Sequence, residues 1–186
     1  MNASVKHVLF VCVENSNRSQ MAEAFARMLG GNTVQAYSAG SCPSGVVNPK
    51  AIAAMRELGY DLSTHGSKSL QELPDVEFDF VATMGCGDEC PFIKARKRED
   101  WSFPDPKYLS PDEYRNVRDQ IREKVRSVLK EIGMSVLYDF PAYSSKPLQE
   151  RPDVGFDFVA RGWRYWIGQY LPFLKWKPCR KYLRCF

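Results

Sequence analysis

The sequence predicts an α/β fold, a doubly wound parallel sheet of about four strands followed by an atypical C-terminal extension. Short apolar runs rich in β-branched residues alternate along the chain with segments whose apolar residues recur at helical spacing. Such alternation is typical of a parallel sheet that is covered on both faces. With 186 residues and 44% hydrophobic content, the chain is long enough for one domain with a sizeable core.

Strands and helices alternate through the first part of the chain. The apolar run at 5–13 predicts a buried strand, and "TVQAYSAG" at 33–40 predicts a second. Asn48, followed by a proline, is a typical helix start, and Gly59 is a typical helix end. A helix is also expected between the two strands, because four apolar residues share one of its faces: Met21, Phe25, Met28 and Leu29.

The second part of the domain repeats this alternation. "FDFVATM" at 78–84 predicts a third buried strand, and "WSFPDP" at 101–106 predicts a short fourth one. Ser110 begins the pattern Ser-Pro-Asp-Glu, which is a capping box with proline at the first helical position. The longest helix is therefore expected to start there and to end at Gly133.

The domain is expected to span 1–140, and 141–186 forms a tail of different character. Residues 145–160 match 67–82 at 13 of 16 positions, which we interpret as a partial duplication because a solenoid needs at least three units. Residues 161–186 hold eight aromatic residues and seven Lys/Arg but no Asp/Glu. We expect the tail to be dispensable. Pairing of its repeated segment at a sheet edge stays open as an alternative, and membrane contact of its basic end is not expected.

The charge distribution argues against nucleic-acid binding. The net charge of +4 arises entirely from the last 26 residues, since the other 160 hold 19 basic and 22 acidic residues. The N-terminal apolar run is too short for an export signal, and no stretch is long enough to span a membrane. Six cysteines in such a chain predict reduced thiols used for chemistry in the cytoplasm.

The turn after the first strand has the composition of an anion site. Cys12 ends the strand, and Arg18 follows six residues later at the start of a helix. Loop N–H groups, a helix N-terminus and a guanidinium can together hold a tetrahedral oxyanion and favour a thiolate. The spacing alone is weak evidence, because Cys90 and Arg96 share it outside a strand-to-helix turn. A buried core cysteine and a solvated arginine are the alternatives.

The segment "CVENSNRSQMAEAFA" resembles the phosphate-binding loop of low-molecular-weight protein tyrosine phosphatases and, more closely, of arsenate reductases built on that fold. The resemblance covers residues 5 to about 135, and the run N-S-x-R-S-Q-M-A-E is typical of the reductases. It implies that Cys12 is the nucleophile, that Asn15 shapes the loop, and that Ser19 donates a hydrogen bond to the thiolate. It also implies an oxyanion-binding loop formed by Glu14, Asn15, Ser16, Asn17, Arg18 and Ser19.

An aspartate before a proline supplies the candidate general acid. The carboxyl group of Asp105 can give a proton to a departing oxygen. Taken alone, an Asp-Pro pair is an ordinary turn former. The family resemblance implies that Asp105 is the acid.

Cys86 and Cys90 lie on a Gly-rich loop directly after the third strand. The Cx3C spacing suits half of a zinc site, but no second pair of ligands follows. The alternative is thiol–disulfide exchange with the nucleophile. The resemblance implies that Cys86 and Cys90 resolve the intermediate on the nucleophile, as the corresponding pair does in three-cysteine arsenate reductases. The external electron donor is then either thioredoxin or a low-molecular-weight thiol, such as mycothiol, acting with glutaredoxin. The loop length leaves the donor open.

No cofactor and no metal are expected. Some members of the family hold a potassium ion beside the loop, and Asn15, Glu23 and Ser38 match three of its ligands. Lys68 stands at the fourth position, so we expect an ammonium group in place of the ion.

The predicted function is reduction of arsenate to arsenite through Cys12, Arg18, Asp105 and the relay cysteines Cys86 and Cys90. The alternative is a phosphatase that hydrolyses phosphate monoesters, which shares every feature except the relay. A non-catalytic oxyanion receptor is disfavoured because a receptor has no need of a nucleophile.

Overall fold

The computed structural model describes residues 5–85, 93–134 and 136. The chain divides into two units, Met1–Ala142 and Tyr143–Phe186. The second unit lies outside the described residues, and so does the predicted duplication with its basic aromatic end.

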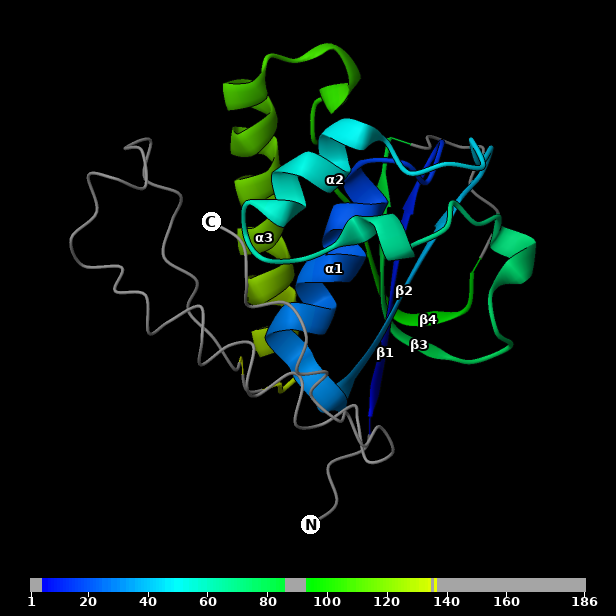
Figure 1. Ribbon diagram of the computed structural model, residues 1–186. Coiled ribbons are helices and arrows are strands. Elements are labelled where there is room, and N and C mark those ends of the chain that lie inside the picture. The colour runs from blue at the N-terminus through cyan, green and yellow to red at the C-terminus, as the bar shows by residue number, and fades with distance from the viewer. Residues whose placement is uncertain (1–4, 86–92, 135, 137–186) are drawn as a thin grey trace, which may run out of the picture. The chain divides into compact units, whose positions relative to one another are not determined.

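A four-stranded parallel sheet forms the centre of the first unit (Figure 1). Its strands lie in the order β2-β1-β3-β4. After β1 the chain adds β2 on one side of β1, and it later adds β3 and β4 on the other side. Such a reversal creates a crevice at the carboxyl ends of the strands, where α/β proteins bind their ligands. The strands are β1 (Lys6–Cys12), β2 (Val34–Gly40), β3 (Phe78–Met84) and β4 (Ala95–Asp100).

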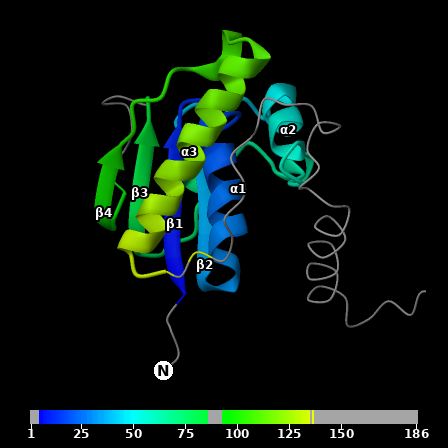
Figure 2. The same cartoon turned by 90° about the vertical axis from the view of Figure 1, so that its left-hand side faces the viewer.

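The two faces of the sheet are covered differently. The helices α1 (Arg18–Gly30), α2 (Pro49–Arg56) and α3 (Pro111–Glu131) supply the larger core, which includes Val8 and Phe10 of β1. Figure 2 shows α1 and α3 lying over this face. Leu9 and Val11 point to the other face and pack in a smaller cluster with Leu70, Leu73 and Val76. Short 3-10 turns complete the structure at Gly31–Thr33, Leu62–Thr64, Leu70–Glu72 and Pro106–Tyr108.

Helix signals in the sequence correspond to observed caps. The side chain of Asn48 accepts a hydrogen bond from the Lys50 amide at 2.9 Å, and a proline follows as the first residue of α2. Ser110 and Glu113 form the expected capping box, with Glu113 Oε2 accepting from the Ser110 amide at 2.9 Å. Of the helices that the structure describes, none combines the length and the apolar character that a membrane span requires.

The fourth strand is not where the sequence predicted it. β4 comprises Ala95–Asp100, "ARKRED", whereas residues 101–105 form no regular structure. Five of its six side chains are charged, so it has no apolar run that periodicity could detect. It forms because it pairs in parallel with β3 at the edge of the sheet, where charged side chains protect an open edge.

Candidate active site

A pocket of about 350 Å³ lies at the carboxyl end of β1, where the chain turns into α1. Three parts of the chain line it: the turn itself, the end of β3 and the segment after β4. Its lining comprises Cys12, Val13, Glu14, Ser16, Asn17, Arg18, Gly85 and Asp105. A larger and more open hollow of about 850 Å³ lies beside α3, but no cysteine lines it. The smaller pocket is therefore the candidate active site.

Cys12 is buried at the base of this pocket, with its Sγ 3.0 Å from Ser19 Oγ. Ser19 Oγ also accepts a hydrogen bond from Asn15 Nδ2 at 2.8 Å. Because the Asn15 amide donates to Ser19, the Ser19 hydroxyl proton is left to be donated to sulfur. That direction of donation favours the thiolate, which is the nucleophilic form.

The backbone of the turn is held by its own carbonyl groups. The Val13, Glu14 and Ser16 carbonyls accept from the amides of Cys42 at 2.9 Å, Ser44 at 3.0 Å and Asn48 at 3.0 Å. The C=O and N–H of one peptide group point in opposite directions, so the N–H groups of the turn are directed away from the segment 42–48. These N–H groups are the donors expected to hold an oxyanion.

Asn15 has a left-handed backbone, with a φ of 47°. Its Oδ1 accepts from the Lys68 amide at 2.8 Å and from Gln20 Nε2 at 2.9 Å. Asn17, in contrast, has a φ of −129°. Asn17 instead contributes its side chain, which accepts from the hydroxyl of Tyr114 at 2.8 Å.

Arg18 and Asp105 meet at the wall of the pocket. Arg18 Nη1 donates to the Phe103 carbonyl at 3.1 Å, and Nη2 lies 3.9 Å from Asp105 Oδ2. Arg18 Nε is buried and has no hydrogen-bond partner among the described residues. A buried donor without a partner is rare, and here it leaves one edge of the guanidinium for a bidentate oxyanion. The Asp105 side chain is 57% exposed, and its Oδ1 accepts from the Lys107 amide at 3.1 Å.

Glu14 is held as a carboxylate by a neighbouring lysine. Its Oε1 accepts from Lys107 Nζ at 2.9 Å, and its Oε2 accepts from Ser16 Oγ at 3.1 Å. The hydrogen bond from Lys107 is the main cause that lowers the pKa of Glu14. The same contact raises the pKa of Lys107.

Cys86 and Cys90 lie outside the described residues. Gly85, the residue before Cys86, lines the pocket with a φ of 75°. A Cβ at this position would lie 3.0 Å from Arg18 Nη1, so the backbone of Gly85 approaches the arginine closely.

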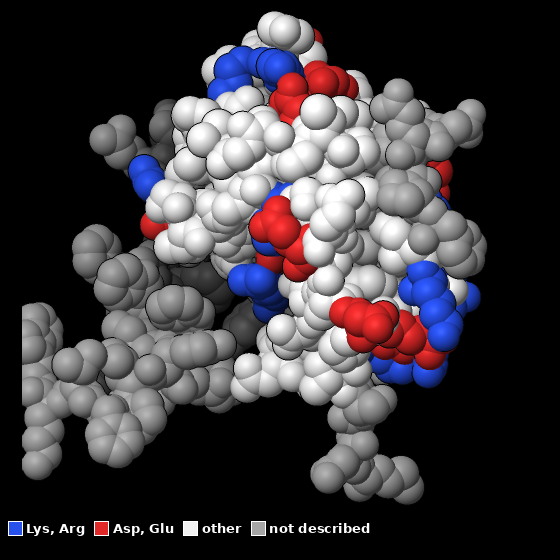
Figure 3. Space-filling view, turned by 90° about the vertical axis from the view of Figure 1, so that its right-hand side faces the viewer, with Lys and Arg blue, Asp and Glu red and all other residues white. Residues whose placement is uncertain are grey.

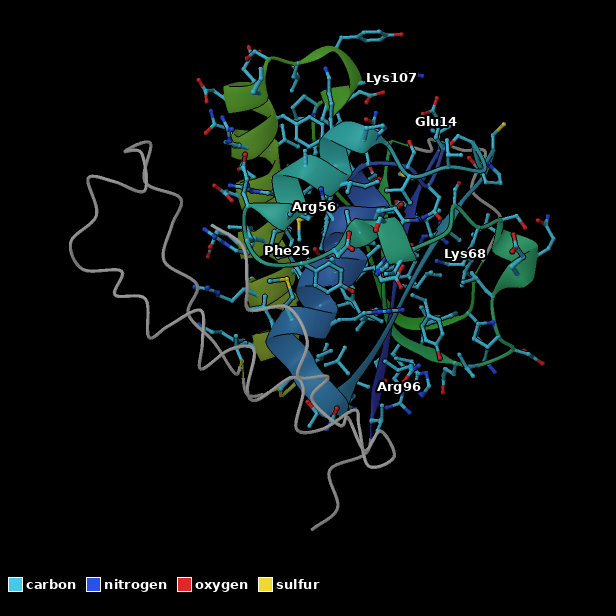
Figure 4. All side chains as sticks on the ribbon, viewed as in Figure 1. Glu14, Phe25, Arg56, Lys68, Arg96 and Lys107 are labelled. Carbon is cyan, nitrogen blue, oxygen red and sulfur yellow. The ribbon has the colours of Figure 1, made fainter. Side chains whose placement is uncertain are left out.

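An ammonium group lies beside Glu23, as expected. Lys68 Nζ is 3.6 Å from Glu23 Oε2, and the same carboxylate accepts from Ser38 and pairs with Arg27 (Figure 4 labels Lys68). The part of the chain that the structure describes contains no group of three or more His, Cys, Asp or Glu residues placed to hold a metal. Charges of both signs are interspersed on the face drawn in Figure 3.

Sequence reasoning missed Lys107 and Tyr114, although both contact residues that line the pocket. Lys107 is two residues beyond Asp105, and nothing in its spacing indicates that its side chain returns to the turn. Tyr114 lies three residues before Val117 on the buried face of α3, so the helical stripe marks it as a core residue but not as a donor to Asn17.

Residues 7–136 match the family described as low molecular weight phosphotyrosine protein phosphatase. The chain therefore belongs to this family, and the pocket occupies the carboxyl end of the sheet that its fold provides.

Within the family, the chain is similar to arsenate reductases. The glutaredoxin arsenate reductase of Synechocystis sp. is 38% identical over 132 residues, which cover 69% of this chain and 100% of the relative. Arsenate reductase 2 of Staphylococcus saprophyticus is 42% identical over 125 residues, which cover 65% of this chain and 94% of the relative. A solved structure described as an arsenate reductase in the phosphate binding state has a TM-score of 0.63 and 37% identity, covering 69% of this chain and 100% of that one.

Proposed function

We propose that this protein is an arsenate reductase in which Cys12 is the nucleophile. The observation that carries the proposal is the buried Cys12 sulfur, 3.0 Å from Ser19 Oγ in a pocket that Arg18 and Asp105 line. Support for arsenate as the substrate comes from the relatives, whose names specify arsenate reduction and which are covered over 94% to 100% of their length.

In the first step the Cys12 thiolate attacks arsenic, and a sulfur–arsenic bond replaces one arsenic–oxygen bond. The Arg18 guanidinium and the N–H groups of the loop, Glu14 to Ser19, hold the remaining oxygens. Asp105 protonates the departing oxygen, which leaves as water. The exposed carboxyl group of Asp105, 3.9 Å from Arg18 Nη2, is close enough to the pocket to serve this role.

In the second step the Cys86 thiolate attacks Cys12 sulfur. A Cys12–Cys86 disulfide forms, the electron pair of the sulfur–arsenic bond passes to arsenic, and arsenite leaves. Cys90 then attacks Cys86, which frees the Cys12 thiolate and leaves a Cys86–Cys90 disulfide for an external thiol donor to reduce. Support for this order comes from the position of Cys86, one peptide bond beyond a residue that lines the pocket.

The external donor is a thiol of the thioredoxin type, or a low-molecular-weight thiol with glutaredoxin. Relatives carry both kinds of name, since a thioredoxin-dependent arsenate reductase of Corynebacterium glutamicum is 31% identical with a TM-score of 0.58. Such donors operate in the reducing cytoplasm, where we place the protein. Arsenate turnover measured separately with thioredoxin, glutaredoxin and mycothiol systems decides between them.

Replacing Cys12 by serine tests its role as the nucleophile. Cys12→Ser is expected to abolish arsenate reduction while the protein still folds and binds oxyanions, because a hydroxyl has no accessible anion at neutral pH. Cys42→Ser is the matched control, since Cys42 is an exposed free cysteine outside the pocket lining. Substantial turnover in Cys12→Ser would remove the central claim.

The relay separates the reductase from a phosphatase, which is the activity that the family name describes. A phosphatase needs no second thiol, because water hydrolyses its cysteinyl-phosphate. Cys86→Ser is therefore expected to stop arsenate turnover and to leave hydrolysis of a small aryl phosphate nearly unchanged.

Cys90→Ser is expected to permit at most one turnover with a dithiol-specific reductant. Wild-type protein after turnover, alkylated and mapped by mass spectrometry, should contain a Cys86–Cys90 disulfide. If the double serine variant reduces arsenate at the wild-type rate with thioredoxin, the relay is wrong.

A further inference from the structure

Glu14 places a negative charge on the wall of a pocket that binds an anion. It lines the same pocket as Cys12 and Arg18, where an uncompensated carboxylate would repel an oxyanion. The compensating charge comes from another part of the chain, since Lys107 Nζ donates to Glu14 Oε1 at 2.9 Å. Figure 4 labels the two residues, which lie next to one another beyond the carboxyl ends of the strands.

Lys107 also holds the candidate acid. Its amide donates to Asp105 Oδ1 at 3.1 Å, and its carbonyl accepts from Lys50 Nζ at 3.1 Å. Lys50 lies in the first turn of α2 and donates to the Leu109 carbonyl at 3.1 Å as well. Three groups of one residue thus make three contacts: the amide with the acid, the carbonyl with α2, and the ammonium with the oxyanion loop.

The other oxygen of Glu14 is anchored from the opposite direction. Ser16 Oγ donates to Glu14 Oε2 at 3.1 Å, and Asn17 Nδ2 donates to Ser16 Oγ at 3.1 Å. The hydroxyl of Tyr114 on α3 donates to Asn17 Oδ1 at 2.8 Å. The carboxylate therefore connects a loop fixed by α3 to the segment that carries Asp105.

We propose that the Glu14–Lys107 pair positions Asp105 for proton transfer and cancels the charge that an incoming oxyanion would otherwise meet. The inference rests on the proposed function in taking Asp105 as the acid. Both side chains are about two-fifths exposed, at 41% and 42%, and exposed ion pairs contribute little to fold stability. The effect of the pair is therefore expected in anion binding and in the acid step. Lys107 is a positioning residue.

The first measurement is the Kd of inorganic phosphate by calorimetry. Lys107→Met leaves the Glu14 charge uncompensated, so the phosphate Kd should rise about tenfold at low salt. In about 0.5 M KCl this rise should be smaller, because salt screens the charge of Glu14. Lys107→Arg keeps the cation and should stay within about twofold of wild type. Glu14→Gln combined with Lys107→Met removes both charges and should restore the Kd.

The second measurement separates acid catalysis from binding. The ratio of kcat/KM for phenyl phosphate to kcat/KM for 2,4-dinitrophenyl phosphate cancels any shared loss of affinity. Phenolate leaves poorly without a proton, whereas dinitrophenolate needs none. Lys107→Met and the double variant should therefore lower this ratio about tenfold, because both release Asp105 from the oxyanion loop. Lys50→Met should lower the ratio without changing the phosphate Kd.

Lys97→Met is the matched control. The Lys97 side chain is 40% exposed, as that of Lys107 is about two-fifths exposed, and it pairs with Glu99 and Glu131, none of which lines the pocket. It should change neither readout. A phosphate Kd that Lys107→Met leaves unchanged, or an equal loss for both esters, overturns the proposal. If the wild type hydrolyses neither ester, the phosphate series alone decides. Neither assay uses Cys86 or Cys90, so a protein that gives the expected Kd series and does not reduce arsenate refutes the proposed function only.

Discussion

Replacing Asn15 tests how the oxyanion loop keeps its shape. Asn15 is fully buried and has a φ of 47°, in the left-handed region. Its side chain donates to Ser19 Oγ at 2.8 Å and accepts from the Lys68 amide at 2.8 Å. Two substitutions separate these contributions, since Asn15→Gly removes the side chain but tolerates the backbone, and Asn15→Ala removes the side chain and strains the backbone.

The magnitude follows from the contacts that each variant loses. Gln20 also donates to Asn15 Oδ1 but keeps a second acceptor, the Gly66 carbonyl at 2.9 Å. The Lys68 amide loses its side-chain acceptor, which costs about 1–3 kcal/mol for a buried donor, and the hydrogen bond to Ser19 contributes about 1 kcal/mol more. We expect Asn15→Gly to lower the free energy of unfolding by about 2–4 kcal/mol. Left-handed backbone costs alanine about 1–2 kcal/mol more.

The two variants at Asn15 should differ in stability in the opposite order from the same variants in an ordinary helix. At exposed Asn116 on α3, alanine should be more stable than glycine by about 1 kcal/mol, which is the ordinary helical order. At Asn15 the order should reverse. Urea unfolding of all four variants measures both differences. Asn15→Ala at least as stable as Asn15→Gly would refute the backbone argument, and losses under about 0.5 kcal/mol in both would refute the hydrogen-bond argument.

Three further predictions concern Gly85 in the pocket, the pH dependence of fold stability and the tail. Gly85→Ala should reduce kcat/KM for arsenate at least about tenfold, because its Cβ would lie 3.0 Å from Arg18 Nη1. Gly59→Ala is the control, since it has the same backbone strain but no atom within 4 Å of its Cβ, and it should leave kcat/KM unchanged. Burial lowers the pKa of His65 below its ordinary 6.5, so the unfolded chain binds more protons below that pH. The free energy of unfolding should therefore decrease between about pH 7.5 and about pH 5.5, and it should decrease less in His65→Gln. Urea midpoints measure both changes, and an equal decrease in the two proteins would contradict this role of His65. A chain truncated after Tyr143 should keep full turnover, as the Synechocystis relative is covered completely by 69% of this chain; lost activity would show that the tail contributes to it.

The sequence was sufficient for elements whose burial leaves a periodic pattern. "FDFVATM" predicted β3 with the bounds that the structure has, because both of its faces are buried. The capping box at Ser110 located the start of α3. It was insufficient for β4, whose charged residues form a strand only because the edge of β3 offers them hydrogen bonds. Local patterns identify elements that bury their own surface, and they miss elements that depend on a neighbour.

The same distinction holds for the site. Cys12 and Arg18 belong to one turn, so their proximity could be inferred from the strand-to-helix pattern, and Asp105 was identified through the family resemblance. The contacts of Lys107 with Glu14 and of Tyr114 with Asn17 join residues 93 and 97 positions apart. No spacing rule relates positions so distant, because the three-dimensional path of the chain decides which of many lysines and tyrosines returns to the loop.

The small residues at the end of β2 show how the sheet constrains the site from beneath. Gly40 pairs with Cys12 in the parallel register, and a Cβ on it would lie 2.6 Å from the Val13 carbonyl and 3.0 Å from the Asn15 amide. No side chain fits in that space without displacing the turn. The turn therefore packs closely against the end of β2, and its carbonyl groups accept hydrogen bonds from the amides of the segment after β2. These hydrogen bonds fix the turn before any ligand binds. Donors that are already oriented need no reorganisation when an oxyanion binds, and we expect this pocket to stabilise a bound oxyanion through such donors.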